Sequence, residues 1–343
     1  MKALVHTAPN TFEMKDVPKP VPAENEILVR IKAVGICGSD VHGMTGHTGR
    51  RKPPIIMGHE ASGIVEACGS KVTRWAPGDR VTFDSTIYCN SCEYCLQGRI
   101  NLCSNRRVLG VSCDEYRRDG AMAEYVVVPE HIVYRLPETV SFLQGALIEP
   151  LSISLHAVNR ARIRIGETVV VMGCGIIGLM AIQCARLSGC GTLIAVDLNE
   201  ARLQMALKVG ADKVINPSKE NTLKAVLSYT EGKGADVAFE AVGLEKTVNE
   251  TLSCVKKGGK LVLIGNLAPM VPIGLQSIVT REIDVYGSAA SSGEYQTCVD
   301  LIGAGRIQVE PYISKVAPLE EGQLWFEKLL SGKEPLYKVI LEP

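Results

Sequence analysis

The chain has 343 residues, which is too long for one ordinary hydrophobic core, so we expect two domains or one domain split by an insertion. Its 37 Lys and Arg residues balance its 37 Asp and Glu residues, and no charged tail interrupts this balance. The composition therefore argues against a nucleic acid or an anionic membrane surface as partner, and it favours a small-molecule ligand.

The first residues, Met1-Lys2-Ala3-Leu4-Val5-His6, form an alternating strand pattern without the apolar segment and cleavage site of a secretory signal. We therefore expect a cytoplasmic protein whose twelve cysteines bind metal or pack in the core rather than form disulfides. Residues 168–185 are nearly uncharged and about as long as a membrane span. They contain three closely spaced glycines, however, and a buried parallel strand followed by a helix has the same hydropathy, so we expect no membrane span.

Residues 1–150 contain short strands separated by Gly and Pro, for example at 26–31 and 120–128, a texture typical of an all-β or barrel-like domain. From residue 151 to 287, helical stretches alternate with apolar strands near 168–172, 193–197, 237–239, 261–264 and 285–287. This rhythm predicts a parallel, doubly wound sheet and hence an α/β protein. Residues 288–343 contain a helix near 295–302, then short strands that most simply rejoin the first domain.

Cys37, His59 and Glu60 combine the side-chain types that hold zinc in a site with an open coordination position. Each also has an ordinary structural interpretation: a core thiol, a hydrogen-bonded interior histidine and an acid at the start of a helix. The residue types alone leave both interpretations open.

Four cysteines stand in the pattern C-x2-C-x2-C-x7-C: Cys89, Cys92, Cys95 and Cys103. Four thiolates within fifteen positions can surround one zinc ion, so we predict a closed, structural zinc site in a lobe at about residues 85–110. The alternative is a set of unrelated core cysteines.

Gly173-Cys174-Gly175-Ile176-Ile177-Gly178 follows an apolar strand and precedes an apolar helix, which is the setting of a dinucleotide-binding loop. The next strand ends in Asp197, about twenty residues beyond the loop, where a carboxylate binds the ribose hydroxyls of the cofactor. This anion favours NAD over NADP, although Arg202 in the following helix could soften the preference. A plain glycine turn in a parallel sheet is the alternative.

The spacing of Gly58-His59-Glu60, Gly63, Gly69 and Val72 resembles the pattern G-H-E-x2-G-x5-G-x2-V of the zinc-containing medium-chain alcohol dehydrogenases. The Cys37-Gly38-Ser39-Asp40 segment, the four cysteines and the dinucleotide loop follow in the same order as in that family, so the resemblance covers essentially the whole chain. It implies a mainly β, GroES-like catalytic domain at 1–150 and 288–343, and a Rossmann NAD-binding domain at 151–287.

The resemblance also implies roles for single residues. Cys37 and His59 match ligands of a catalytic zinc, and Ile148-Glu149-Pro150 resembles the polyol and threonine dehydrogenase branch, in which Glu60 and Glu149 can each enter the coordination sphere. Ser39 matches the hydroxyl that takes the substrate's proton, and His42 matches the histidine that passes it outward. The residues expected to bind the cofactor are Gly173, Gly175, Ile176, Ile177, Gly178, Asp197, Arg202, Ile264, Gly265 and Ser288.

The expected activity is oxidation of a secondary alcohol of a polyol or sugar to a ketone, with two zinc ions per chain and NAD as hydride acceptor. Sorbitol-type members carry an arginine and an aromatic residue where this chain has residues 288–292, Ser-Ala-Ala-Ser-Ser, so sorbitol itself is not favoured. The basic loop at 48–52 could bind a substrate phosphate, as in galactitol-phosphate dehydrogenases, but a solvated loop is favoured.

Other functions stay open at this stage. They are a threonine-type or other secondary alcohol dehydrogenase, a zinc-ribbon nucleic-acid-binding protein, and a noncatalytic NAD-binding regulator. The resemblance also implies a homo-oligomer, a dimer or tetramer, paired through the strand edge near residues 285–287.

Overall fold

The computed structural model describes residues 1–112 and 117–343, which fall into two compact units. The first unit comprises Met1–Glu149 and Ser292–Pro343, and the second comprises Pro150–Ser291.

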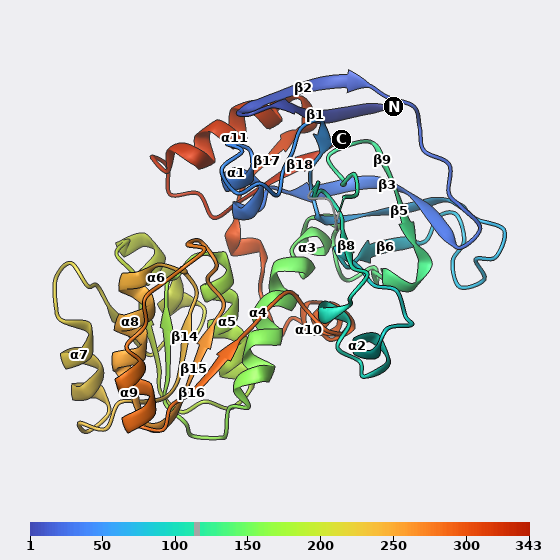
Figure 1. The fold of residues 1–343 in the computed structure, drawn as a ribbon. Coiled ribbons are helices and arrows are strands. Elements are labelled where there is room, and N and C mark those ends of the chain that lie inside the picture. Colours follow the sequence, from blue (N-terminus) through green and yellow to red (C-terminus); the bar gives the residue numbers. More distant parts are fainter. Residues whose placement is uncertain (113–116) are drawn as a thin grey trace. The chain divides into compact units, whose positions relative to one another are not determined.

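The first unit is mainly β (Figure 1). Its large sheet has the order β10-β6-β5-β3-β18-β17, and β9 also pairs with β3. A smaller sheet has the order β2-β1-β4, and β7 pairs with β8. The strands are β1 (Lys2–Ala8), β2 (Thr11–Asp16), β3 (Glu26–Gly35), β4 (Ile55–Ile56), β5 (Glu60–Cys68), β6 (Arg80–Phe83), β7 (Thr86–Ile87), β8 (Arg107–Val108), β9 (Tyr125–Pro129), β10 (Val133–Arg135), β17 (Ile313–Pro318) and β18 (Lys338–Glu342).

Short helices connect these strands: α1 (Gly38–Gly43), α2 (Glu93–Leu96), α3 (Phe142–Ala146), α10 (Tyr295–Gly303) and α11 (Gly322–Ser331), with 3-10 turns at Ile100–Leu102, Glu130–Ile132, Glu310–Tyr312 and Leu319–Glu321. One apolar core joins the amino-terminal strands to the carboxyl-terminal segment, with Phe12 stacked on Phe326 at 4.3 Å between ring centroids. The carboxyl-terminal residues therefore complete the first unit, because β18 pairs with β3 and β17 pairs with β18.

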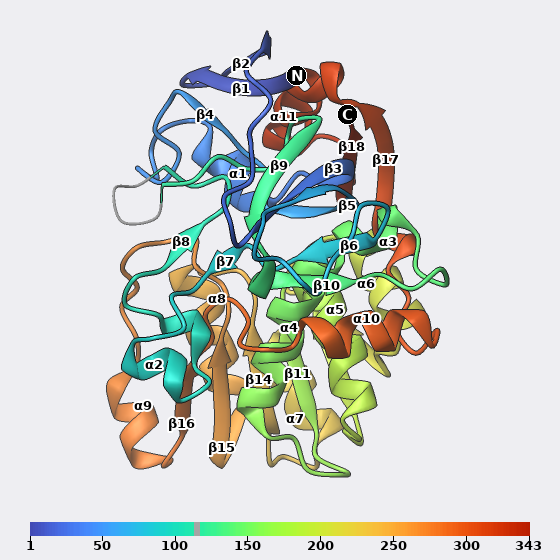
Figure 2. The same ribbon diagram turned by 90° about the vertical axis from the view of Figure 1, so that its right-hand side faces the viewer.

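The second unit contains a six-stranded parallel sheet in the order β13-β12-β11-β14-β15-β16, flanked by helices on both faces (Figures 1 and 2). Its strands are β11 (Val169–Met172), β12 (Leu193–Val196), β13 (Lys213–Ile215), β14 (Ala235–Glu240), β15 (Val255–Leu263) and β16 (Asp284–Gly287). The helices are α5 (Ile176–Leu187), α6 (Glu200–Lys208), α7 (Thr222–Tyr229), α8 (Glu245–Cys254) and α9 (Leu275–Thr280), together with α4 (Ile148–Ala161), whose first two residues belong to the first unit.

The adjacent strands β11 and β12 are apolar and buried at every position, because both faces of the sheet are covered. The predicted fold class, a doubly wound parallel sheet together with a mainly β part, is confirmed. The apolar residues 168–185 form β11 and α5, and no helix among the described residues has the length and hydropathy needed to cross a bilayer.

Candidate active site

The pairing of β3 with β5 brings the first zinc-ligand candidates together. The two strands are antiparallel, and Gly35, the last residue of β3, lies opposite Glu60, the first residue of β5. Cys37 follows β3 by two positions and His59 immediately precedes β5, so both flank the paired position. The close approach requires glycine at position 35, because a Cβ atom there would lie 2.3 Å from Glu60 Oε2.

One donor atom from each of Cys37, His59 and Glu60 lies within 4.8 Å of the other two. His59 and Glu60 are 7% and 1% exposed, and burial raises the pKa of the Cys37 thiol to about 12, with the Glu60 charge adding to the effect. A thiol in this setting stays protonated unless a cation compensates its charge. The donor set therefore fits zinc, which binds thiolate, imidazole and carboxylate at about 2.0–2.3 Å. The interpretation of Glu60 as an acid at a helix start is wrong, since it begins a strand.

Lys338 neutralises Glu60 from the opposite end of the sequence. Its ammonium nitrogen lies 2.5 Å from Glu60 Oε2 and 3.1 Å from the carbonyl oxygen of Ile36, and its side chain is 2% exposed. Burial lowers the pKa of Lys338, but the charge of Glu60 and further nearby groups raise it by more, so the pKa of Lys338 lies above its ordinary value and the ammonium group stays charged. Sequence analysis missed this residue, which reaches the site because β18 pairs with the end of β3.

Asp40 and Arg51 form a second buried pair beside the same group. Arg51 donates to Asp40 Oδ1 from Nε at 2.9 Å and from a terminal nitrogen at 2.7 Å, and the side chains are 5% and 0% exposed. The other oxygen of Asp40 lies 3.3 Å from His59 Nδ1, an electrostatic contact without hydrogen-bond alignment. This contact on Nδ1 leaves Nε2 of His59 available as a donor to metal. The expectation of a solvated basic loop is therefore wrong for Arg51.

Ser39 and His42 both lie on α1, directly after Cys37. The Ser39 hydroxyl donates to Cys37 Sγ at 3.3 Å and accepts from Arg51 at 3.4 Å, and Ser39 remains exposed. His42 is exposed one turn further along the helix. A hydroxyl at the thiol and an exposed imidazole on the same short helix are the components that a proton path to solvent requires.

Glu149 lies outside the compact group of three donors but close to it. It is in the first turn of α4, it is 8% exposed, and its Oε1 accepts from the Ser85 hydroxyl at 3.3 Å. Burial raises the pKa of Glu149 to about 8; the nearby His59 opposes the shift, whereas Glu60 and Cys37 add to it. The charges of the three donors therefore act on Glu149, and a cation among them would favour its charged form.

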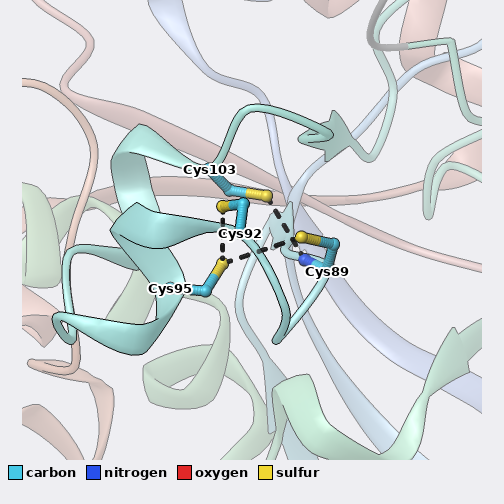
Figure 3. Close-up of side chains that lie close together, drawn as sticks. All are labelled: Cys89, Cys92, Cys95 and Cys103. Atoms are coloured by element: carbon cyan, nitrogen blue, oxygen red, sulfur yellow. Dashed lines mark hydrogen bonds between the residues drawn. The ribbon is translucent and has the colours of Figure 1, made fainter.

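The four cysteines of the lobe point their sulfur atoms toward one another (Figure 3). Cys92 and Cys95 sulfurs are 3.5 Å apart, and those of Cys89 and Cys95 are 4.0 Å apart. Donors from the loop lower the pKa of Cys89 to about 5, led by the Ser91 hydroxyl, while burial raises that of Cys95 to about 12. Cys103 accepts from the backbone N–H groups of Cys89 and Asn105 at 3.3 and 3.4 Å. Such N–H donors stabilise thiolates, so the lobe fits a tetrahedral metal ion.

In the second unit, the glycine-rich loop joins β11 to α5. Gly173 has a φ of 93°, and a Cβ on Gly178 would lie 1.8 Å from the Gly173 carbonyl oxygen, so both positions require glycine. A Cβ on Gly175 would meet no atom within 4 Å, which leaves open space at the N-terminus of α5. This arrangement fits a pyrophosphate on the helix N-terminus.

Asp197 follows β12 at the same edge of the sheet. Its carboxylate accepts from the N–H groups of Cys174 and Asn199 at 2.7 and 2.8 Å, so it is fixed against the glycine-rich loop. Arg202 lies 3.9 Å from it and is 41% exposed. The contact is long and solvated, so Arg202 neutralises Asp197 only weakly.

Ile264 and Gly265 follow β15, and Ser288 follows β16, so they too lie at the carboxyl ends of parallel strands. The Ser288 hydroxyl is buried and has no hydrogen-bond partner among residues 1–112 and 117–343. A buried hydroxyl without a hydrogen-bond partner destabilises the fold, and a bound polar ligand could supply the missing hydrogen bond.

Comparison with known proteins gives consistent matches along the chain. The alcohol dehydrogenase GroES-like domain matches residues 23–138, and the zinc-binding dehydrogenase domain matches residues 177–304. The chain is 34% identical to sorbitol dehydrogenase of Bacillus subtilis (strain 168), with 99% of each chain covered.

Two solved structures share the fold of the whole chain. One is galactitol-1-phosphate dehydrogenase from Escherichia coli, with a TM-score of 0.92, 29% identity and complete coverage of both chains. The other is a putative zinc-binding dehydrogenase from Sinorhizobium meliloti 1021 bound to NADP, with a TM-score of 0.91, 34% identity, and coverage of 100% of this chain and 99% of the other.

The buried Arg51 and Asp40 pair yields a stability prediction. Arg51→Met should destabilise the fold by about 3–5 kcal/mol, because it leaves the Asp40 carboxylate buried without its cation. Thermal unfolding of the zinc-loaded protein measures the effect. Arg50→Met is the matched control, since Arg50 is exposed and should change stability by less than about 0.5 kcal/mol. Equal melting temperatures for the two variants would contradict the assigned role of the pair.

Proposed function

Because the chain belongs to the zinc-binding alcohol dehydrogenase family, we propose that it oxidises a secondary alcohol of a polyol or sugar to a ketone, with NAD as hydride acceptor. The observation that carries this proposal is the convergence of Cys37, His59 and Glu60 beside the exposed hydroxyl of Ser39. Family membership makes the chain an oxidoreductase and favours this function over a zinc-ribbon nucleic-acid-binding protein or a noncatalytic regulator.

In the proposed mechanism, Cys37 and His59 would hold a catalytic zinc, and Glu60 and Glu149 are the acids that could bind it in turn. When bound, zinc lowers the pKa of an alcohol oxygen and NAD accepts the hydride. The Ser39 hydroxyl takes the alcohol proton and passes it toward His42, whose imidazole is exposed and can exchange the proton with solvent. Asp40 orients His59, and Lys338 balances the charge of Glu60.

We further propose two zinc ions per chain, the second held by Cys89, Cys92, Cys95 and Cys103. Four thiolates fill a tetrahedral ion, so this site has no position for substrate and is structural. In keeping with metal binding rather than disulfide formation, the cysteines of the described segments are free thiols. Free thiols are typical of a reducing compartment and support the proposed cytoplasmic location.

The second unit is the proposed NAD-binding domain, and the first is the proposed catalytic domain. Asp197 supports NAD over NADP, because its charge would repel a 2′-phosphate on the adenosine ribose and Arg202 offsets it only weakly. The NADP-bound structure from Sinorhizobium meliloti shows that a protein of this fold can accept the phosphorylated cofactor. The ratio of kcat/KM with NAD to kcat/KM with NADP therefore tests the proposed role of Asp197.

The proposed substrate class is a polyol or sugar, with or without a phosphate group. It is supported by the similarity to sorbitol dehydrogenase and to galactitol-1-phosphate dehydrogenase. Arg51 is paired with Asp40, so any contribution of the 48–52 loop to phosphate binding would come from its exposed members, Arg50 and Lys52.

A spectrophotometric assay of NADH formation tests the proposed function. With zinc-loaded protein and a panel of polyols, sugars, sugar phosphates and amino alcohols, we expect turnover of a polyol or sugar and a higher kcat/KM with NAD than with NADP. Brief chelation should abolish turnover before the protein unfolds, because the Cys37 site keeps an exchangeable position. Turnover of threonine alone would support the threonine-type alternative, and a pure protein without zinc would refute both metal assignments.

Glu149→Ala tests the exchangeable acid. The variant should fold and keep the zinc of the four cysteines, but its turnover or its affinity for catalytic zinc should fall about 10- to 100-fold, as is usual when a group near a metal is lost. Glu138→Ala is the control, since the Glu138 side chain is 87% exposed. If Glu149→Ala has the kcat, KM and zinc content of the wild type, the proposed role of Glu149 as a zinc ligand is wrong and the residue is only part of the first turn of α4.

We also propose a homo-oligomer, a dimer or tetramer, in which copies pair through β16. This strand lies at the edge of the parallel sheet, and the preceding segment exposes apolar side chains at Met270, Leu275 and Val279, which are 87%, 68% and 65% exposed. An open strand edge beside exposed apolar residues favours burial against a second copy. Light scattering that gives the mass of one 37.0 kDa chain at micromolar concentration would contradict it.

A further inference from the structure

Glu240 is a fully buried acid in the second unit that the proposed reaction does not use. It is the last residue of β14 and its side chain is 0% exposed. Its carboxylate accepts from the Val242 N–H at 3.1 Å and from the Gly243 N–H at 2.9 and 3.0 Å. The Thr247 hydroxyl donates to the same carboxylate at 2.7 Å. Charge-assisted bonds of this kind are among the stronger ones in proteins, so Glu240 fixes the conformation of residues 241–243.

The segment that Glu240 fixes is packed backbone to backbone against the segment that follows β15. The N–H groups of Ile264 and Gly265 donate to the Glu240 carbonyl oxygen at 2.8 and 3.0 Å, and the Ala268 N–H donates to the Gly243 carbonyl oxygen at 2.9 Å. A Cβ on Gly265 would lie 2.1 Å from the Gly243 nitrogen. Residues 241–243 and 264–268 therefore form one paired-loop unit, and a shift of the first loop displaces the second.

The paired-loop unit also abuts the glycine-rich loop. A Cβ on Gly173 would lie 2.5 Å from Val242 Cγ2, so Val242 packs directly on the turn that follows β11. In a doubly wound sheet, a dinucleotide crosses the carboxyl ends of the strands with its pyrophosphate at the central loop. Asp197, after β12, marks the side of the adenosine ribose, and the paired-loop unit lies on the other side of β11, at the ends of β14 and β15.

We propose that Glu240 is a positioning residue for the nicotinamide half of the cofactor, acting through the paired-loop unit that it holds in place. This inference rests on the proposed dinucleotide function. The buried carboxylate of Glu240 already accepts hydrogen bonds from Val242, Gly243 and Thr247. It therefore fixes the conformation of the loops that would bind the nicotinamide and does not contact the cofactor itself. The adenosine half would be held by a different set of groups, around Gly175 and Asp197, so the two halves should respond separately to a change at Glu240.

Calorimetric titration of the zinc-loaded protein with two probes, NADH and ADP-ribose, tests the proposal. Glu240→Gln keeps the shape of the side chain but removes the charge of the acceptor for Val242, Gly243 and Thr247, and it places an amide N–H₂ against the Gly243 N–H at the position of Oε2. It should weaken NADH binding about 10- to 100-fold and change ADP-ribose binding by less than about 3-fold, because ADP-ribose lacks the nicotinamide. Thr247→Val removes one donor from the carboxylate and should show a smaller loss with the same selectivity.

The controls separate this role from a purely structural one. Glu245→Gln changes an exposed acid on the adjacent helix and should bind both probes as the wild type does. Equal weakening of NADH and ADP-ribose, or no change for either probe, would overturn the positioning role while leaving the proposed function intact. A wild-type protein that binds neither probe would refute the dinucleotide function itself. If Glu240→Gln does not fold, the selectivity of Thr247→Val decides between these outcomes.

Discussion

The candidate active site depends on one strand register, the pairing of Gly35 with Glu60 at the ends of β3 and β5. Because side chains alternate along a strand, a shift of one residue would turn Glu60 away and separate Cys37 from His59. The absence of a side chain at position 35 allows the Glu60 carboxylate to occupy the space above the partner strand. The same strand end pairs with β18, so the position that aligns the donors also brings Lys338 to Glu60.

Two buried ion pairs stabilise this register and also constrain the chemistry. Glu60 with Lys338 and Asp40 with Arg51 each place opposite charges in a site that excludes water, where an unpaired charge would be costly. In each pair the cation contacts one oxygen of the carboxylate: Lys338 contacts Oε2 of Glu60, and Arg51 contacts Oδ1 of Asp40. Each pair therefore balances charge without using both oxygens, and the second oxygen of Asp40 faces His59.

The local motifs of the sequence predicted the fold class and the composition of the donor groups, because those signals are carried by neighbouring residues. The four cysteines lie within fifteen positions, and the glycine-rich loop stands between its strand and its helix. Lys338 was not predictable in the same way: it lies 278 positions from Glu60 and reaches it only through the pairing of β18 with β3. Arg51 stands among basic residues and looks solvated, and only the folded chain reveals that Asp40 buries it. Glu240 belongs to no sequence motif, since its partners are two backbone N–H groups and the hydroxyl of Thr247.

In both units, glycine residues permit a close backbone approach that a buried acid then fixes. In the first, Gly35 lets a carboxylate approach a strand, and in the second, Gly243 and Gly265 let two loop backbones meet. In both cases a buried acid fixes the close contact: Glu60 accepts from an ammonium group, and Glu240 accepts from two backbone N–H groups and a hydroxyl. A carboxylate held by local donors fixes the nearby backbone, which fits the proposed role of the paired-loop unit in positioning the nicotinamide. A carboxylate held by Lys338 keeps one oxygen outside the ion pair, which fits the proposed role of Glu60 as a metal ligand.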